Sequence, residues 1–358
     1  MSKKIFTVIG ARPQFIKAAV VSRALTETEG IEELIVHTGQ HFDDNMSRVF
    51  FEELNIPRPS YNLDIHSLGH GAMTGRMLEN LEELMEKETP DMVLVYGDTN
   101  STLAGALAAA KLHIPVAHVE AGLRSYNMAM PEEINRILTD RVSKMLFCPT
   151  GGAVKNLQNE GFKEYDCQII QSGDVMYDAA RYYSSTVNLA KQELSSRYIL
   201  ATLHRAENTD NPKRLHAIME ALAEISQITP VVLPIHPRTK NILEKNAKRP
   251  DIKNLLITEP VGYLKMISLL KNCEMVMTDS GGLQKEAYFF QKPCVTLRDE
   301  TEWTELPDHG VNILSGANKD KILEAYQRFS KNTVFFPAGL YGNGNAGKII
   351  ADALKEIL

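Results

Sequence analysis

Three carboxylates in this chain stand where a protein could move protons. Asp98 and Glu120 each follow a short apolar run, and Glu132 follows the proline that opens the stretch "PEEINR". Each carboxylate taken alone is commonly a helix cap or a structural ion pair, and Glu132 also fits the acidic first turn of a helix. Their joint occurrence favours proton transfer to and from carbon or oxygen, because acids set among bases can have pKa values tuned apart.

Basic residues accompany these acids. Arg12 and Lys17 lie in "GARPQFIK" after the first apolar run, and Arg124 and Arg136 lie close to the second and third carboxylates. Local basic side chains of this kind can hold a ligand with one or two phosphate groups. The net charge of −6 at pH 7 argues against a nucleic-acid partner, which needs a basic face.

The stretch "MTDSGGLQKEA" has the pattern of a strand, two glycines and a helix. Gly281 and Gly282 would let the backbone approach an anion, which the amide groups at the helix start can bind. The alternative is a tight turn capped by Asp279 or Ser280. The pattern favours phosphate binding, with Glu286 placed to accept hydrogen bonds from ribose hydroxyls.

Two other motifs predict no ligand. "GNGNAG" matches a dinucleotide fingerprint, but only the final helix follows it, so no room remains for the strand–helix–strand unit that such a motif opens. His37, His41, His66 and His70 are loosely spaced, and the sequence fixes no acidic third ligand beside them. We therefore predict neither a metal site nor a bound cofactor.

The composition is that of a soluble globular protein, with 44% hydrophobic and 23% charged residues. Its four cysteines lie far apart, which suggests neither a zinc knuckle nor a disulfide framework and fits a reducing cytoplasm. The sequence has no recognisable signal peptide and no apolar run of transmembrane length. It thus predicts a cytoplasmic protein without a membrane partner.

The candidate residues lie at the ends of short apolar runs that alternate with helical stretches. The runs are typical of parallel strands buried on both faces, and in the first half they cover 4–10, 33–38, 91–97, 115–120, 144–150 and 168–173. The pattern pauses near 183–197 and restarts with runs at 198–204, 229–236, 254–259, 273–279 and 292–297. Between the runs, helices are expected at 72–87, 100–111 and 133–143 among others.

This alternation predicts doubly wound parallel sheets, so the fold class is α/β with two Rossmann-like domains. In such sheets ligands bind beyond the carboxyl ends of the strands. Polar segments follow eight of the predicted strands, among them "HRAEN" with His204 and Arg205, and "RDETE" with Arg298. Two polar rims of this kind, facing each other, would form one cleft.

An ordered set of motifs resembles the non-hydrolysing UDP-N-acetylglucosamine 2-epimerase family over nearly the whole chain. The motifs are "GARPQFIK", "GDTNSTLAG", "HVEAGLR", "MPEEINRILTD", "TLHRAEN", "PIHPR", "TDSGGLQKEA" and "LRDETEW". The resemblance implies the GT-B architecture with an interdomain cleft. It also implies a first domain of residues 1–173 plus 344–358, which includes a returning C-terminal helix, and a UDP-binding domain of residues 174–343.

Members of this family are isomerases that invert carbon 2 of a UDP-linked acetamido sugar by eliminating UDP and adding it back to a glycal-type intermediate. The resemblance implies a homodimer that takes a UDP-sugar substrate for surface-polysaccharide or O-antigen synthesis. It implies that Asp98, Glu120 and Glu132 form the acid/base set and that His204 assists the departing diphosphate. The implied substrate and UDP contacts are Arg12, Lys17, Arg136, Arg205, Ser280, Gly281, Gly282, Glu286 and Arg298. Arg136 would also orient the helix start, where Glu133 would remain plain N-terminal charge.

The chain departs from better-known members, which read GTRPE and TERPE where it has "GARPQ" and "TEWTE". Gln14 and Trp303 therefore place it in a branch that resembles enzymes acting on UDP-2,3-diacetamido-2,3-dideoxyglucuronate, with UDP-N-acetylglucosamine as the other candidate substrate. Some members are activated by a second UDP-N-acetylglucosamine through a "QHxQ" segment. Here Gln40 and His41 persist but Asp43 replaces the second glutamine, which argues against such activation.

Three other functions stay open. They are a hydrolysing epimerase that frees UDP and the sugar, a GT-B glycosyltransferase with a UDP-sugar donor, and a UDP-sugar sensor without catalysis. The three carboxylates argue against the sensor. A transferase would need an acceptor site, which the sequence does not define.

Overall fold

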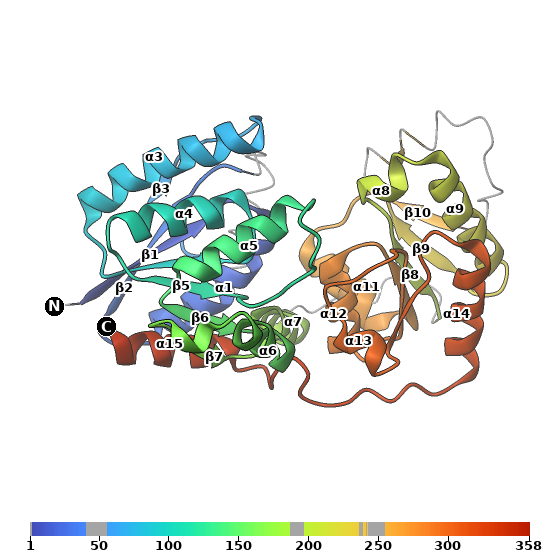
Figure 1. The fold of residues 1–358 in the computed structure, drawn as a ribbon. Coiled ribbons are helices and arrows are strands. Elements are labelled where there is room, and N and C mark those ends of the chain that lie inside the picture. Colours follow the sequence, from blue (N-terminus) through green and yellow to red (C-terminus); the bar gives the residue numbers. More distant parts are fainter. Residues whose placement is uncertain (1, 41–55, 187–196, 236–238, 241, 243–254) are drawn as a thin grey trace. The chain divides into compact units, whose positions relative to one another are not determined.

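The computed structural model describes residues 2–40, 56–186, 197–235, 239–240, 242 and 255–358. The chain divides into two compact units, Met1–Ala179 with Gly339–Leu358, and Ala180–Ala338 (Figure 1). The domain boundaries expected from the sequence, after residues 173 and 343, stay predictions. None of the helices in the described part of the chain is long and apolar enough to span a membrane.

The first unit is built on a seven-stranded parallel sheet with the order β3-β2-β1-β4-β5-β6-β7. The strands are β1 (Lys3–Ile9), β2 (Ile31–His37), β3 (Tyr61–Asn62), β4 (Met92–Tyr96), β5 (Val116–Val119), β6 (Met145–Cys148) and β7 (Gln168–Gln171). Val8 of β1 pairs with Val36 on one side and Val95 on the other. The strand order thus reverses between β1 and β4, the point at which doubly wound sheets bind ligands.

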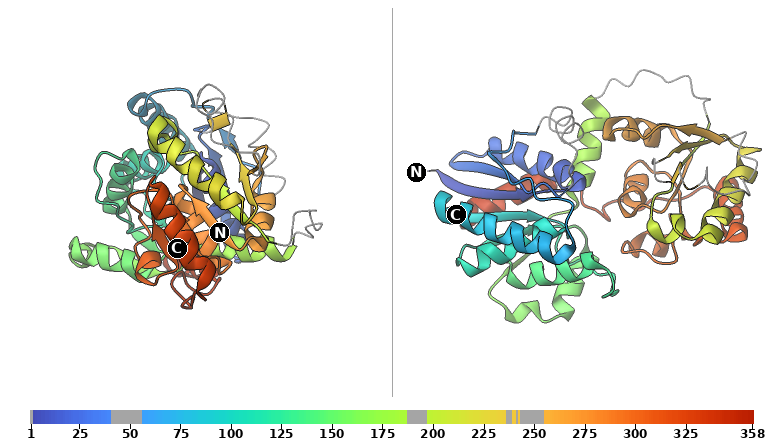
Figure 2. Two further views of the ribbon diagram at one scale, coloured as in Figure 1. Left: turned by 90° about the vertical axis from the view of Figure 1, so that its right-hand side faces the viewer. Right: turned by 90° about the horizontal axis from the view of Figure 1, so that it is seen from above.

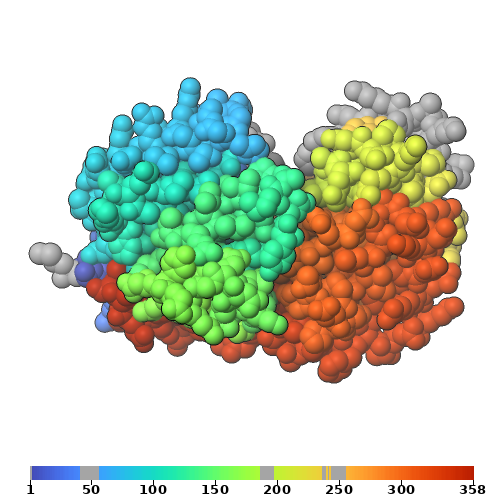
Figure 3. All heavy atoms as spheres, viewed as in Figure 1, coloured from blue at the N-terminus to red at the C-terminus, as the bar shows by residue number. Residues whose placement is uncertain are grey.

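Helices cover both faces of this sheet (Figures 1 and 2). α3 (His70–Glu88), α4 (Asn100–Lys111) and α5 (Pro131–Val142) lie side by side on one face, and their side chains form a continuous surface in Figure 3. α1 (Arg12–Thr26) and α15 (Ala346–Ile357) pack together on the other face. The remaining helices of this unit are α6 (Gly151–Asn159), the 3-10 turn η1 (Phe162–Glu164) and α7 (Val175–Thr186), which runs across the boundary between the units.

Residue spacing explains these helix positions. α3 buries Met73, Met77, Leu81 and Met85, four residues apart on one stripe, against the strands. Gly347 lets α15 approach α1 closely, because a Cβ atom there would lie 2.7 Å from Val20 Cγ1.

The second unit repeats the plan with a six-stranded parallel sheet in the order β10-β9-β8-β11-β12-β13. The strands are β8 (Ile199–Thr202), β9 (Val231–Pro234), β10 (Leu255–Thr258), β11 (Met275–Thr278), β12 (Cys294–Thr296) and β13 (Asn312–Leu314). The helices are α8 (Ala206–Thr209), α9 (Pro212–Ser226), α11 (Tyr263–Asn272), α12 (Gly281–Phe289), α13 (Glu305–Asp308) and α14 (Lys319–Lys331). This order also reverses, between β8 and β11.

Alternate residues of β8 belong to two different cores. Ile199 and Ala201 join the core that α9 and α14 complete, and Leu200 joins the core that α11 and α12 complete. Both faces of the strand are therefore buried, which explains the unbroken apolar run in its sequence.

The predicted α/β class with two Rossmann-like sheets is confirmed. Each of the eleven strands predicted from the sequence is present, with ends that differ from the predicted ones by at most two residues. The short edge strands β3 and β13 were not predicted, because two or three residues are too few to show a pattern.

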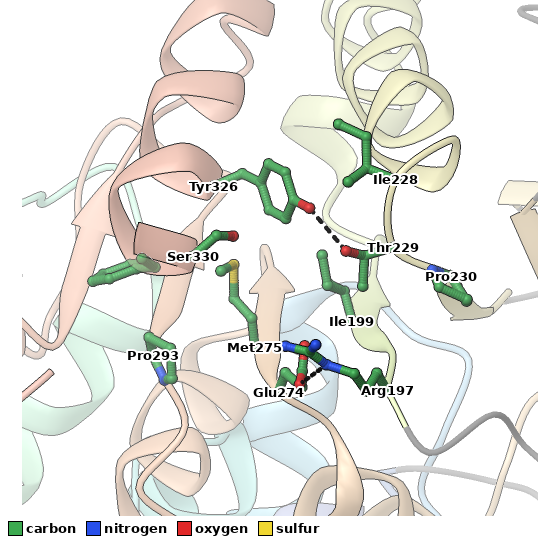
Figure 4. A pocket seen from close by; sticks show the side chains of 11 residues that line it. Arg197, Ile199, Ile228, Thr229, Pro230, Glu274, Met275, Pro293, Tyr326 and Ser330 are labelled. Atoms are coloured by element: carbon green, nitrogen blue, oxygen red, sulfur yellow. Dashed lines mark hydrogen bonds and ion pairs between the residues drawn. The ribbon is translucent and has the colours of Figure 1, made fainter. Parts of the chain in front are cut away.

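A pocket of about 460 Å³ borders the amino ends of β8, β11 and β12 (Figure 4). Its polar rim contains an ion pair between Arg197 and Glu274 at 2.6 Å and a hydrogen bond between Thr229 and Tyr326 at 2.8 Å. The pocket lies at the strand ends opposite to those from which the candidate residues follow. It is therefore not where a doubly wound sheet binds its ligand.

Candidate active site

Asp98 lies in the turn that joins β4 to α4. The residue before it, Gly97, has a left-handed φ of +64°, which glycine adopts without strain. The main-chain carbonyl of Asp98 accepts a hydrogen bond from Asn135 Nδ2 at 2.9 Å, and its carboxylate forms an ion pair with Arg136. Two side chains of α5 thus fix this turn at the point where the strand order reverses.

Glu120 directly follows β5 and has a left-handed φ of +74°. Such a backbone costs a residue with a side chain about 1–3 kcal/mol, and strain of this kind is concentrated at functional sites. The amides of Glu120 and Ala121 both donate to the Phe147 carbonyl at 3.0 Å. The Glu120 carboxylate forms an ion pair with Lys17, which α1 contributes and which is buried. The structure thus brings a predicted acid and a predicted base into contact.

The two glutamates of "PEEINR" differ sharply. Pro131 begins α5, Glu132 is exposed, and Glu133 is completely buried. The Glu133 carboxylate accepts hydrogen bonds from the amides of Ser125 and Tyr126 at 3.0 and 2.8 Å and forms an ion pair with Arg136. The interpretation of Glu133 as plain helix-start charge was therefore wrong. The Glu133 side chain instead ties the segment between Glu120 and α5 to the helix.

Arg136 bridges the carboxylates of Asp98 and Glu133. Burial would lower the pKa of its guanidinium, but Asp98 and Glu133 raise it above the ordinary value, so the side chain stays charged. One buried cation therefore orients both the helix start and the first candidate acid.

We expect the variant Glu133→Gln to lower the free energy of unfolding by about 3 kcal/mol. This is the low end of the range for breaking a buried ion pair, because the glutamine oxygen can still accept an amide hydrogen bond. Urea unfolding followed by circular dichroism measures the change. An unchanged unfolding midpoint would show that the buried pair contributes nothing.

Acid should remove the stabilisation by ionised Glu133 from the wild-type protein. Burial raises the Glu133 pKa, but the two amide bonds and Arg136 together lower it below the ordinary value of 4.5. Because the folded-state pKa is the lower one, the stabilisation is complete above pH 4.5 and is lost as the pH falls through the folded-state pKa. The difference between wild type and Glu133→Gln should therefore shrink on acidification, and a constant difference would contradict this cause.

The neutral side chain of Gln14 organises the loop after β1. Its Oε1 accepts the amides of Gly10 and Ala11 at 2.8 and 2.9 Å, and its Nε2 donates to the Tyr96 carbonyl at 2.9 Å. A glutamate could not donate this last bond. Gln14 thus joins the end of β1 to the end of β4, close in the chain to Arg12 at the start of α1.

In the second unit, Asp279 organises the loop that carries His204 and Arg205. Its completely buried carboxylate accepts the amides of His204 at 3.1 Å and Arg205 at 3.0 Å. Nδ1 of the exposed His204 ring lies 3.3 Å from the same carboxylate. The sequence left Asp279 as a possible cap of α12, but its carboxylate instead fixes the segment after β8. Asp279 follows β11, and the strand order reverses between β8 and β11.

The start of α12 differs from the simple anion cradle predicted from its two glycines. Ser280 is the N-cap residue, but its side chain makes no capping hydrogen bond. A Cβ atom at Gly281 would lie 2.1 Å from Glu302 Oε1, whereas one at Gly282 would meet nothing within 4 Å. Gly281 therefore makes room for a carboxylate of the protein, and Gly282 leaves its side of the helix start open. Glu286 is buried one turn further on.

Arg298 is buried beside this helix start and lies between two carboxylates. Its Nη1 is 3.0 Å from Glu302 Oε2, and its Nε is 3.7 Å from Glu207 Oε1. Trp303 is also buried, and the Lys285 ammonium of α12 lies 4.3 Å from the centre of its ring. The segment "RDETEW" thus packs against α12 through both Arg298 and Trp303.

The motifs that predicted no ligand have local roles. Gly342 of "GNGNAG" has a φ of +85°, and a Cβ atom there would lie 2.9 Å from Gly173 Cα, so two glycines let two chain segments cross. His37 and His70 have Asn62 and Asn100 as partners at 3.1 and 3.2 Å. In the described ranges no three His, Cys, Asp or Glu side chains form a group that could hold a metal. His41 and Asp43 lie outside those ranges.

The predicted site residues divide between the two units, and the site that they form stays a prediction. Arg12, Lys17, Asp98, Glu120, Glu132 and Arg136 belong to the first unit, and His204, Arg205, Ser280, Gly281, Gly282, Glu286 and Arg298 to the second. Sequence reasoning missed the organising role of Glu133, although its spacing of three residues from Arg136 was a usable indication.

Comparisons with known proteins agree with the resemblance seen in the motifs. The family described as UDP-N-acetylglucosamine 2-epimerase matches residues 23–355. A Pseudomonas aeruginosa protein named UDP-2,3-diacetamido-2,3-dideoxy-D-glucuronate 2-epimerase is 56% identical over 99% of this chain and 100% of its own. A Methanocaldococcus jannaschii protein named UDP-N-acetylglucosamine 2-epimerase is 44% identical over 98% of each chain.

Two solved structures show the same fold. The Methanocaldococcus jannaschii enzyme in complex with UDP-GlcNAc and UDP has a TM-score of 0.84 at 43% identity, over 99% of this chain and 100% of its own. The Neisseria meningitidis enzyme bound to UDP-GlcNAc has a TM-score of 0.88 at 30% identity, over the same shares of the two chains. The motif-based resemblance is therefore confirmed.

Proposed function

Because this chain belongs to the UDP-N-acetylglucosamine 2-epimerase family, we propose that it inverts carbon 2 of a UDP-linked acetamido sugar and returns the sugar to UDP. The observation that carries this proposal is the set of three carboxylates that follow strands β4 and β5 or begin α5 in the first unit. Two of them, Asp98 and Glu120, have a cation as a direct partner. Such paired acids suit proton transfer.

The reaction needs one base and one acid on opposite faces of the sugar. The base takes the proton from carbon 2, the bond between carbon 1 and the UDP oxygen breaks, and a double bond forms between the two carbons. An acid then gives a proton to the other face of carbon 2, and UDP returns to carbon 1. We assign these proton transfers to Asp98, Glu120 and Glu132 as a set.

We assign UDP binding to the second unit. The start of α12 at Gly282, where a side chain would meet nothing within 4 Å, and the side chain of Arg205 suit the diphosphate, whose negative charge grows as it leaves. His204 would assist that departure, and the buried Glu286 would accept ribose hydroxyls. Arg12 and Lys17 would add positive charge from the first unit.

For the sugar we propose UDP-2,3-diacetamido-2,3-dideoxyglucuronate. The proposal rests on the name of the 56% identical relative and on the branch resemblance of the motif "TEWTE", which contains Trp303. UDP-N-acetylglucosamine is the alternative substrate, named for the 44% identical relative.

We expect Arg298→Ala to weaken the uronate substrate about 10- to 100-fold. A guanidinium can hold a carboxylate with charge-assisted hydrogen bonds, and losing one such contact costs about 1.5–3 kcal/mol. Michaelis constants for the uronate and for neutral UDP-N-acetylglucosamine measure the effect, and the neutral sugar is the control. Equal losses on both substrates would assign Arg298 to the shared UDP framework or to holding Glu302.

Product analysis by NMR tests the proposed function. Each of the two UDP-sugars is incubated with the enzyme, and the epimerised UDP-sugar is expected to accumulate to an equilibrium mixture. Release of free sugar and UDP would instead identify a hydrolysing epimerase. Conversion that requires an added sugar acceptor would identify a glycosyltransferase.

The same proposal extends to the setting of the reaction. We propose a homodimer that works in the cytoplasm and supplies O-antigen synthesis, as the family resemblance implies. The half-exposed Ile134 and Leu138, four residues apart on α5, offer an apolar strip that a second copy could cover.

A further inference from the structure

A histidine of β5 stands out beside the candidate acids. His118 is completely buried and precedes Glu120 by two residues. Its Nδ1 lies 2.7 Å from Asp140 Oδ1, and its Nε2 lies 2.7 Å from the Gly97 carbonyl oxygen. The ring therefore joins a carboxylate of α5 to the turn that presents Asp98.

Both ring nitrogens of His118 lie within hydrogen-bond distance of an oxygen atom. A carbonyl oxygen can only accept, so Nε2 carries a proton. Burial would raise the pKa of Asp140, but His118 and Arg124 together lower it, so this carboxylate is ionised. The same cluster includes Arg124, which contacts Asp140 at 2.7 Å and Glu160 at 2.6 Å.

The hydrogen bonds of β5 to the turn before Asp98 converge on one residue, Gly97. The amide of Gly97 donates to the Val119 carbonyl at 2.9 Å, and its carbonyl accepts from His118. Both polar groups of Gly97 are therefore fixed by β5. A Cβ atom at Gly97 would lie 3.1 Å from Lys17 Nζ, the partner of Glu120. The carbonyl that His118 binds belongs to the peptide that leads into Asp98.

We propose that His118 is a positioning residue for the epimerisation, acting through Gly97 to hold Asp98 where it can exchange a proton with the sugar. This inference rests on the proposed function, because it takes Asp98 as one of the proton-transferring acids. Misplacing a reacting group by a fraction of an ångström to an ångström is enough to cost about 10²-fold in rate. The competing explanation is that His118 only supplies a hydrogen-bond partner to the buried Asp140.

Two conservative variants separate these explanations. In His118→Gln the amide nitrogen takes the place of Nε2 and can still donate to Gly97. In His118→Asn it takes the place of Nδ1 and can still donate to Asp140. We expect the Asn variant to lower kcat about 10²-fold with little change in KM, and the Gln variant to stay within about tenfold of wild type. Thermal melting of both variants reports the folding cost separately.

The relative kcat values of the two variants decide between the two explanations. An Asn variant that is as active as the Gln variant, or more active, would overturn the assignment, and so would a Gln variant that does not fold. If only the Asn variant does not fold, a double-mutant cycle that combines His118→Gln with Asp98→Asn decides between the explanations. The effect of His118→Gln on kcat should largely vanish once Asp98 is replaced, and a full multiplicative loss would contradict action through Asp98. A wild-type chain that converts neither UDP-sugar would instead refute the proposed function itself.

Discussion

Replacing Asp98 with Asn is expected to lower kcat at least about 10²-fold, the usual size of a lost general acid or base. Asparagine has nearly the same shape and keeps the main-chain carbonyl that Asn135 binds, but it cannot take up a proton. UDP affinity should change much less, because Asp98 itself is assigned to proton transfer and not to a contact with UDP. Steady-state kinetics and calorimetric titration with UDP measure the two quantities.

The control for this variant is Asp352→Asn, which makes the same chemical change at an exposed position of α15. It should leave kcat unchanged. Near-normal turnover in Asp98→Asn would show that Asp98 only forms an ion pair with Arg136 and transfers no proton. A parallel loss of UDP affinity and turnover would show that the variant disturbs binding instead of proton transfer.

Replacing Glu132 with Gln should also lower kcat at least about 10²-fold, but without loss of stability. Glu132 is exposed, so its carboxylate contributes little to the fold. Its neighbour Glu133 is the opposite case, since it is buried and ion-paired with Arg136. Comparing Glu132→Gln with Glu133→Gln therefore separates an effect on catalysis from an effect on stability at the same helix start.

Unfolding midpoints and kcat, measured on both variants, give the answer. The expected pattern is a stable but slow Glu132→Gln protein and a less stable Glu133→Gln protein. If Glu132→Gln keeps near-normal turnover, the ordinary interpretation of "PEEINR" as an acidic helix start is correct.

Much of the fold could be predicted from local patterns. Strands such as β4 and β8 are buried on both faces, so their apolar runs are unbroken and easy to recognise. The edge strand β3 has two residues and β13 has three, and pairing with a neighbour, not local sequence, makes them strands. α15 belongs to the first unit although it follows the second in the chain, and only the family resemblance indicated this return.

Candidate residues next to strand ends were also predictable, because the parallel sheet dictates where such residues lie. The contacts that these residues make with residues distant in the sequence could not be predicted. Gly281 suggested an anion cradle, but the space beside it is filled by Glu302, twenty-one positions later. His118 was equally hidden, because one histidine in an apolar strand shows neither its partner at Gly97 nor its partner at Asp140.

The central claim is that the enzyme breaks and remakes the bond between carbon 2 and its hydrogen. Running the reaction in deuterium oxide tests this most directly, with NMR or mass spectrometry of the recovered UDP-sugar. The account predicts that the epimerised product carries deuterium at carbon 2 and that the sugar remains joined to UDP. Epimerised product without deuterium at that carbon would contradict the elimination mechanism and remove the proton-transfer roles assigned to Asp98, Glu120 and Glu132.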